Sequence, residues 1–228
     1  MIVFCAGSKA GSGASTLAAT VAAGLVERGV ARHRVLLLDV GRGATLSHWA
    51  AIAGAAGQRL VTVVRPPATV RASELAEGFD HVIVDLPGLP TGGRPPIDLA
   101  PDLWLVPCRP VGPDTWHLPP RAAETDARDG FRAPVRIVPW RVPSRLDPGP
   151  WRRGVEAAGW AVAPVVVRER IAYAHAFSTG RMPTAAGDVA VRSEAAALGG
   201  YVLGWQEAHD ARPQADVAPV DGATPYLH

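Results

Sequence analysis

Short apolar runs alternate with alanine-rich stretches along most of the chain. Continuous apolar runs alternating with helical patterns are typical of a mainly parallel sheet that helices cover on both faces. The sequence therefore predicts an α/β fold with a twisted sheet. The predicted strands are Ile2–Ala6, Arg34–Asp39, Leu60–Val64, His81–Asp85, Leu103–Pro107, Val135–Pro139 and Trp160–Val167.

The stretches between and after these runs predict helices. In the first of them, Leu17, Val21 and Leu25 recur at helical spacing and form one apolar stripe. Between Pro113 and Gly130 the pattern is helical only in its second half, since paired prolines at 119 and 120 break a helix. The predicted helices are Ser15–Arg28, Thr45–Ala56, Val70–Glu77, Trp151–Ala158, Glu169–Ser178 and Asp188–Ala208.

Length and composition indicate one globular domain. The 228 residues are enough for a single α/β domain, which we place at residues 1–209, with a polar, proline-containing tail at 210–228. The formal charge of +2 does not by itself indicate nucleic-acid binding. Neither a leader segment nor a membrane span is visible, so we expect a cytoplasmic protein. Cys5 and Cys108 lie in apolar runs, which indicates buried thiols.

The main chemical feature is a glycine-rich turn between the first apolar run and the first helix. It contains Lys9, the only lysine of the chain, and its glycines let the backbone approach an anion closely. A P-loop reads G-x-x-x-x-G-K-[ST], and here Ala14 stands in place of the lysine before Ser15. One cationic residue of a phosphate site is present and another is missing.

The turn has two other interpretations. It could be a plain strand-to-helix turn in which Ser15 caps the helix. It also resembles the turn of short-chain dehydrogenases, with Asp39 in the place of a ribose-binding acid. Those enzymes need a Tyr-x-x-x-Lys pair, but Phe177 stands four residues after Tyr173, so this interpretation lacks its catalytic pair.

Five segments, in the same order, resemble motifs of the ParA/MinD-type deviant Walker A ATPases. Their signature loop reads K-G-G-x-G-K-T-T, and the later motifs include a second-strand acid pair and a Walker B strand. The resemblance covers roughly residues 1–208 and is nearest to the short plasmid-partition and DNA-transfer members. The matching segments are Lys9–Thr16, Val35–Trp49, Phe79–Gly88, Asp102–Asp114 and Arg170–Gly180.

The resemblance implies a P-loop fold that binds ATP or ADP with Mg²⁺. It assigns Lys9 and Asp39 to catalysis, with Lys9 reaching the nucleotide of a partner subunit. It assigns magnesium binding to Ser15, Asp39 and Asp85. The residues it assigns to nucleotide binding are Lys9, Ala10, Gly11, Ser12, Gly13, Ala14, Ser15, Thr16 and Arg141.

The chain departs from the family at two catalytic positions. Ala14 replaces the lysine that holds the β- and γ-phosphates, and Gly41 replaces the second acid of the strand motif D-x-D. Both losses predict weak or absent ATP hydrolysis and weakened nucleotide binding. Arg42 is the nearby residue that could compensate in charge, and an exposed loop arginine is its other interpretation.

Two functions follow from the resemblance. The first is nucleotide-dependent homodimerisation in plasmid or chromosome partition or positioning, with a cognate partner protein. The second is a non-catalytic scaffold in secretion, cellulose synthesis or DNA transfer.

Trp116, Trp140 and Trp151 mark either a partner surface or packing at the rim of the core. Late arginines could form a patch for non-specific DNA, or they could be scattered solvated charges: Arg152, Arg153, Arg168, Arg170, Arg181 and Arg192.

Overall fold

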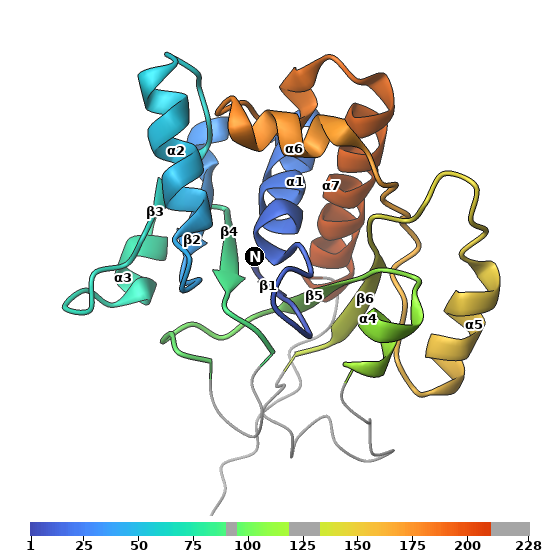
Figure 1. The fold of residues 1–228 in the computed structure, drawn as a ribbon. Helices are drawn as coiled ribbons and strands as arrows, with labels where there is room; N and C mark the ends of the chain where they lie inside the picture. The colour runs from blue at the N-terminus through green and yellow to red at the C-terminus, as the bar shows by residue number, and fades with distance from the viewer. Residues whose placement is uncertain (90–94, 119–132, 211–228) are drawn as a thin grey trace, which may run out of the picture.

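A six-stranded, all-parallel sheet forms the centre of the computed structural model, which describes residues 1–89, 95–118 and 133–210. The strand order is β3-β2-β4-β1-β5-β6, so β1 lies inside the sheet between β4 and β5 (Figure 1). The predicted α/β fold is confirmed. The strands are β1 (Ile2–Ala6), β2 (Val35–Asp39), β3 (Thr62–Val64), β4 (His81–Leu86), β5 (Leu103–Cys108) and β6 (Val135–Pro139).

Helices cover both faces of this sheet. The two single-turn 3-10 helices are Arg32–Arg34 and Pro183–Ala186. The α-helices are α1 (Ala14–Glu27), α2 (Thr45–Ala55), α3 (Ala72–Ala76), α4 (Gly112–Trp116), α5 (Gly149–Ala157), α6 (Ile171–Ser178) and α7 (Val189–Asp210). Within the described ranges, no helix is both long and apolar enough to cross a lipid bilayer.

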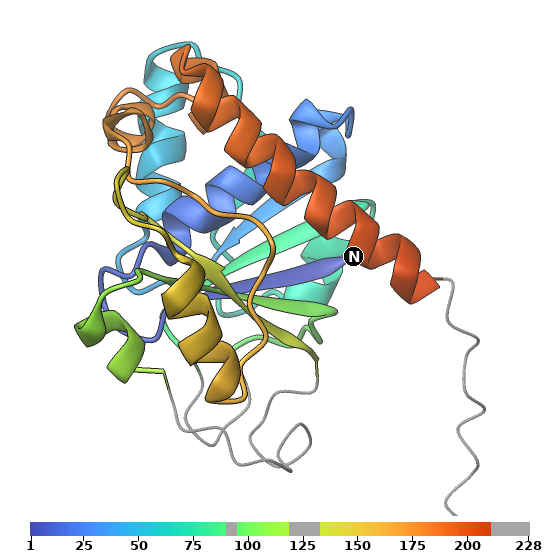
Figure 2. The same cartoon turned by 90° about the vertical axis from the view of Figure 1, so that its right-hand side faces the viewer.

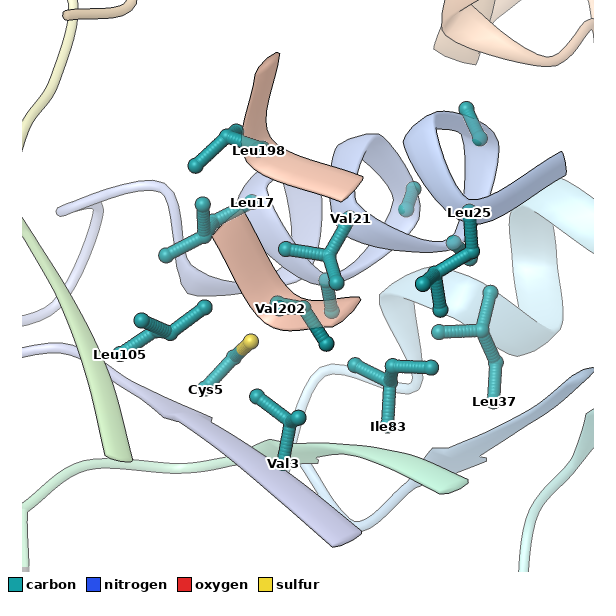
Figure 3. Packing of buried hydrophobic residues seen from close by; sticks show 14 of the residues in the cluster. Val3, Cys5, Leu17, Val21, Leu25, Leu37, Ile83, Leu105, Leu198 and Val202 are labelled. Atoms are coloured by element: carbon teal, nitrogen blue, oxygen red, sulfur yellow. The ribbon is translucent and has the colours of Figure 1, made fainter. Parts of the chain in front are cut away.

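Alternate side chains of each strand enter two separate apolar layers. Val3 and Cys5 of β1 pack with Leu17 and Val21 of α1 and with Val202 of α7 (Figure 3). On the opposite face, residues of β1, β2 and β5 pack with α3 and α5. Both faces of the sheet are therefore dry, which is why its strands read as continuous apolar runs rather than as an alternation.

Most predicted elements agree with the structure to within two residues, with two exceptions. The predicted strand Trp160–Val167 is wrong, because this extended segment makes only the isolated bridges Ile137↔Val162 and Val142↔Arg168. The helix expected late in Pro113–Gly130 lies outside the described residues, which instead contain the short helix α4 before it. The prolines at 119 and 120 and the tail after 210 also lie outside them.

The two cysteines are buried and unpaired in the structure, as predicted. Burial and the neighbouring Asp85 both raise the pKa of the Cys5 thiol, and burial also raises the pKa of Cys108, to about 12. Both thiols therefore stay protonated at neutral pH and serve as apolar packing groups.

Helix α7 crosses α1 at a point where both helices have glycine. Figure 2 shows the long α7 lying diagonally over α1. A Cβ built on Gly24 would lie 1.9 Å from the carbonyl oxygen of Ala195, and one built on Gly199 would lie 2.2 Å from the carbonyl carbon of Gly24. The two backbones are therefore in direct contact, and this contact fixes α7 against the helix that follows the phosphate loop.

This contact yields a test of the packing. Gly199→Ala should lower the free energy of unfolding by about 2 kcal/mol or more, because the added methyl group overpacks the crossing. Gly204→Ala is the matched control on the same helix, since nothing lies near its Cβ position. It should be neutral or stabilising by up to about 1 kcal/mol. Urea denaturation measures both changes, and equal effects of the two substitutions would contradict the close contact.

Candidate functional site

The glycine-rich loop leads directly from β1 into α1, at the carboxyl edge of the sheet. Gly11 and Gly13 both have positive φ angles, 75° and 99°, which favour glycine. Gly13 is the N-cap of α1, and no side chain caps the helix there. The N-terminal amides of α1 and its dipole are thus available to an anion in the loop. The loop therefore differs from a plain turn in which the Ser15 side chain caps the helix.

The loop forms the floor of a cavity of about 1360 Å³. Because the six strands are parallel, their carboxyl ends meet at one edge, and the segments after β1, β2, β4 and β6 line this cavity. Segments after β2 and β4 form one side of it. The segment after β6 and helix α6 form the other side. Residues 9–16 and Arg141, all predicted to bind nucleotide, line the cavity together.

Lys9 is held by a carboxylate of its own chain. Its Nζ lies 2.6 Å from Oδ1 of Asp114 in α4, and the Asp114 side chain is only 8% exposed. The indole N–H of Trp151 donates to Thr115 Oγ1 at 2.9 Å and ties the next residue of α4 to α5. The sequence motif contained Asp114, but nothing in the pattern indicated this pair, because the contact joins segments 105 residues apart.

Asp39 and Asp85 lie side by side at the carboxyl ends of β2 and β4. They are register partners in the parallel ladder, and both are buried. Burial raises the pKa of Asp85 to about 7, a hydrogen bond from Ser15 opposes the rise, and the charge of Asp39 adds to it. The structure therefore brings together the three residues predicted to bind magnesium.

Asp39 also organises the start of α2. Its Oδ2 accepts hydrogen bonds from Ser47 N at 2.8 Å and from Ser47 Oγ at 2.6 Å. Its Oδ1 is buried and has no hydrogen-bond partner in the described chain. Oδ2 thus holds the start of α2 in place, and Oδ1 faces the space beside Asp85.

Arg65 is a functional residue that the sequence analysis missed. It follows β3, its Nη1 lies 3.7 Å from Asp39 Oδ1, and it donates to the carbonyl oxygen of Gly41 at 2.8 Å. Arg65 is therefore the cation beside this carboxylate, and the exposure of Arg42 agrees with its interpretation as an exposed loop arginine. Arg42 lines the cavity and is exposed. The position of Arg65 at a strand end, beside the predicted acid, was the available signal.

Gly41 leaves a gap between the two carboxylates. A Cβ built there would lie 3.5 Å from Asp39 Oδ1 and 3.5 Å from Asp85 Oδ2, which is ordinary contact. An acidic side chain at this position would add a third negative charge to two that already repel. Glycine adds no charge at this position.

On the β6 side of the cavity, two guanidinium groups share one carboxylate. Glu169 Oε1 lies 3.0 Å from Arg141 Nη2 and 3.3 Å from Arg109 Nη2. Arg141 has a positive φ angle of 49°, which is uncommon for a residue with a side chain. Arg141, predicted to bind nucleotide, lines the cavity, and its charge is already paired.

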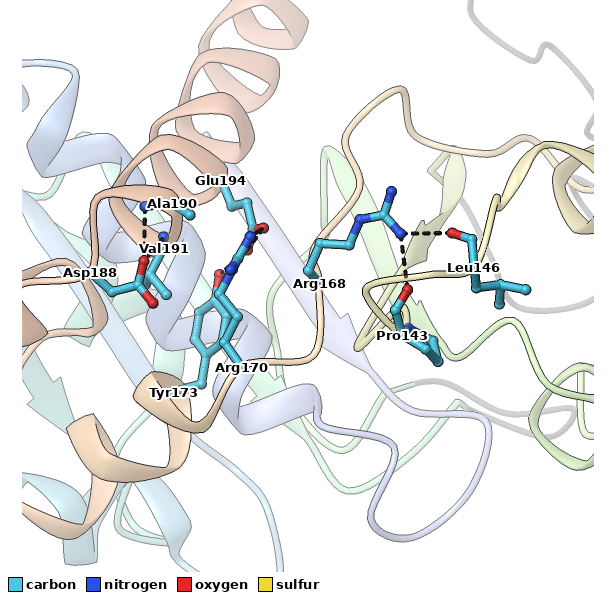
Figure 4. A network of polar contacts seen from close by, with 9 residues as sticks. All are labelled: Pro143, Leu146, Arg168, Arg170, Tyr173, Asp188, Ala190, Val191 and Glu194. Atoms are coloured by element: carbon cyan, nitrogen blue, oxygen red, sulfur yellow. Dashed lines mark hydrogen bonds and ion pairs between the residues drawn. The ribbon is translucent and has the colours of Figure 1, made fainter.

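Helix α6, which closes this side, is fixed by polar contacts to α7 (Figure 4). Glu194 of α7 accepts from the Arg170 guanidinium at 2.9 Å and from the Tyr173 hydroxyl at 3.0 Å. Burial and then the charge of Glu194 raise the pKa of Tyr173 far above its usual value, so the hydroxyl stays a donor. Asp188 Oδ1 caps α7 by accepting from Ala190 N at 2.9 Å.

Several of the late arginines form hydrogen bonds or ion pairs with other residues of the chain and do not form one exposed patch. Arg168 donates to the carbonyl oxygens of Pro143 and Leu146, and Arg152 donates to that of Ala163 (Figure 4 shows Arg168). Arg170 pairs with Glu194 as above, and Arg192 Nε lies 3.8 Å from a carboxylate oxygen of Glu27.

The three tryptophans predicted near the site differ in exposure. Trp140 is 1% exposed and Trp116 is 79% exposed, whereas Trp151 is partly buried and bonded to α4 as described. Trp140 therefore packs in the core, and Trp116 is presented to solvent by the helix that carries Asp114.

Comparison with known proteins adds to this geometry. No protein-family model and no curated protein matches the chain by sequence. Solved structures do match. A chain of the MinC:MinD cell division protein complex from Aquifex aeolicus is 16% identical, with a TM-score of 0.62 over 89% of this chain and 95% of that chain.

Two further matches have related names. A ParA family ATPase from Chlorobium tepidum is 14% identical, with a TM-score of 0.58 over 86% of this chain and 95% of that chain. A Cyanothece McdA variant in complex with ATP is 14% identical, with a TM-score of 0.55 over 94% and 97%. The strand order, the position of the glycine-rich loop and these matches agree: the chain has the α/β fold of the ParA/MinD-type P-loop ATPases.

Proposed function

We propose that this chain is a ParA/MinD-type positioning or partition protein that binds Mg²⁺–nucleotide, dimerises on binding it, and hydrolyses ATP slowly or not at all. The observation that carries the proposal is the cavity itself. A loop with free helix amides faces a hydroxyl and two adjacent carboxylates, while alanine stands where the P-loop lysine belongs.

The oxygen groups fit a magnesium ion. Mg²⁺ prefers oxygen ligands and keeps several waters, so few protein ligands are enough. Ser15, Asp85 and Asp39 Oδ1 supply a hydroxyl and two carboxylates at one place, and Oδ1 accepts no hydrogen bond in the described chain, its nearest cation being Arg65 Nη1 at 3.7 Å. Bound Mg²⁺ would supply positive charge against the phosphates, and these residues would hold it.

The cations around the phosphate position fit poorly with hydrolysis. A P-loop lysine stabilises charge on the transferred phosphoryl group, and Ala14 cannot. Lys9 is held by Asp114, and Arg141 by Glu169. With Gly41 also unable to position a water molecule, the chain retains groups that bind phosphates but lacks those that drive their transfer.

One observation favours a second function, a scaffold that no longer uses nucleotide. The pairing of Lys9 with Asp114 satisfies the lysine inside a single chain, so no phosphate is needed to explain it. The exposed Trp116 on the same helix, and Ile171 at 88% exposure on the cavity wall, would then contact a partner protein. Contacts to DNA through the late arginines remain a further proposal, although four of the six are bonded within the chain.

The first prediction concerns the missing lysine. Ala14→Lys should strengthen binding of Mg·ADP by about tenfold or more, because it restores a charge-assisted hydrogen bond to phosphate. Isothermal titration calorimetry measures this change. The control is Ala51→Lys, which adds the same charge on exposed α2 and should leave affinity unchanged. The scaffold function predicts no binding by the natural protein, whereas the proposed function predicts saturable binding.

A second prediction concerns the restraint on Lys9. Asp114→Asn removes the negative charge that holds it, so ATP should convert a larger fraction of the protein to dimer. Lys9→Ala should abolish this conversion. Light scattering with and without Mg·ATP measures it. Asp80→Asn, which breaks the exposed pair with Arg34 at the start of β4, is the matched control. A dimer fraction that ignores both Lys9→Ala and Asp114→Asn would contradict the role of the lysine.

A third prediction follows from the buried carboxylate. The folded pKa of Asp85, about 7, lies above the ordinary 3.8, so the folded chain favours the protonated acid. The stability that protonated Asp85 contributes to the folded chain is complete below pH 4. It is lost as the pH rises from there through 7, at a total cost of roughly 4 kcal/mol. Asp85→Asn should therefore raise the melting temperature at pH 8.5 without metal or nucleotide.

The pH dependence separates this electrostatic effect from packing. At pH 5 the folded side chain is mostly protonated while the unfolded one is ionised, so only part of the cost has accrued, and the rise in melting temperature should be clearly smaller than at pH 8.5. Differential scanning calorimetry at both pH values measures the difference. An equal shift at pH 5 and at pH 8.5 would show that charge on Asp85 does not limit stability.

A further inference from the structure

Trp140 has a buried donor without an acceptor. The side chain is 1% exposed, and its Nε1 has no hydrogen-bond partner in the described chain. Two other indole groups have partners: Trp49 Nε1 donates to the carbonyl oxygen of Arg181 at 3.1 Å, and Trp151 Nε1 donates to Thr115 Oγ1 at 2.9 Å. A buried N–H without an acceptor lowers the stability of the folded chain, so an unpaired donor at this position needs an explanation.

The unpaired group lies against the phosphate loop. A Cβ built on Gly13 would lie 2.4 Å from Trp140 Nε1 and 3.1 Å from its Cδ1, so the N–H edge of the ring abuts this glycine. Gly13 is also the N-cap of α1, where the helix amides are uncapped. Trp140 is part of the cavity wall together with Tyr173, whose ring centroid lies 5.9 Å away.

We propose that Trp140 is a nucleotide-binding residue, whose indole N–H donates to an acceptor atom of the bound nucleotide. The proposal rests on the proposed function and names a donor for the same site. Two acceptors share the required chemistry: an oxygen of the phosphates above Gly13, and a ring nitrogen of a purine placed on the β6 side of the cavity. Both would satisfy a group that the free protein leaves unpaired.

Gly13 provides the means of access. The Nε1 atom is covered in the free protein, so a ligand reaches it only if the loop moves slightly. Gly13 has φ of 99° and no Cβ, and glycine changes its backbone angles at little steric cost. Binding of the nucleotide would thus shift the loop and supply the missing acceptor in one step. The conformation of the loop would then depend on whether nucleotide is bound, even though the chain has alanine instead of lysine at position 14.

The test uses the indole N–H signals of the natural protein in ¹⁵N nuclear magnetic resonance. The signal of Trp140 is assigned by its absence from Trp140→Phe, or by its nuclear Overhauser effects to Gly13 if that variant does not fold. Mg·ADP should move this signal more than those of Trp49 and Trp151, whose donors are already paired. Movement with pyrophosphate alone identifies a phosphate oxygen as acceptor, and movement with adenosine alone identifies the purine.

Affinity provides the second readout. Trp140→Phe keeps an aromatic ring but removes the donor, so it should weaken Mg·ADP binding about tenfold. Trp205→Phe, which removes an indole that does not line the cavity, should leave binding nearly unchanged. Mg·ADP could bind and shift the loop amide signals while the Trp140 signal stays in place and Trp140→Phe keeps the natural affinity. That result would overturn this inference but not the proposed function. Absence of any nucleotide binding would overturn the proposed function, and the inference with it.

Discussion

Two carboxylates buried side by side are the electrostatic constraint around which this site is built. Asp39 and Asp85 face each other across neighbouring parallel strands, and neither is accessible to water. Like charges at such a distance and depth cannot both ionise without compensation. The chain responds with Ser47 and Arg65 on Asp39 and with Ser15 on Asp85, whose pKa nevertheless rises to about 7. A divalent cation held by these oxygen atoms would relieve the remaining cost.

Cationic side chains also line the cavity, and two of them are already paired with carboxylates. Lys9 is paired with Asp114, and Arg141 shares Glu169 with Arg109. A ligand must therefore compete for these two cations, or contact backbone amides or the exposed Arg42. Under the proposed function, this arrangement and Ala14 together favour recognition of a nucleotide over chemistry on it. It also links the loop to α4, because the acid that holds the lysine belongs to that short helix.

Much of the fold could be predicted from local pattern, because parallel strands buried on both faces are continuous apolar runs. β1 and β6 have the predicted bounds. The segment 160–167 was misleading for the same reason: it is apolar and rich in valine, yet it lies beyond β6 and makes only isolated bridges. Apolar composition indicates burial, and ladder pairing depends on the neighbouring segment.

The candidate site was predictable only where motif spacing defines it. The loop, Ser15, Asp39 and Asp85 come together as expected, since strand ends meet at one edge of the sheet. The pairs Lys9–Asp114 and Asp39–Arg65 and the unpaired indole of Trp140 depend on contacts between distant segments, which no spacing rule encodes. These contacts decide whether the retained charges are free to act.

The most direct test of the account is equilibrium dialysis of the natural protein against radiolabelled Mg·ATP, with chromatography of the protein-bound nucleotide after several hours. The account predicts saturable binding of one nucleotide per chain, recovered mainly as ATP. A protein chamber that holds no excess label, or bound nucleotide recovered entirely as ADP within minutes, would contradict it.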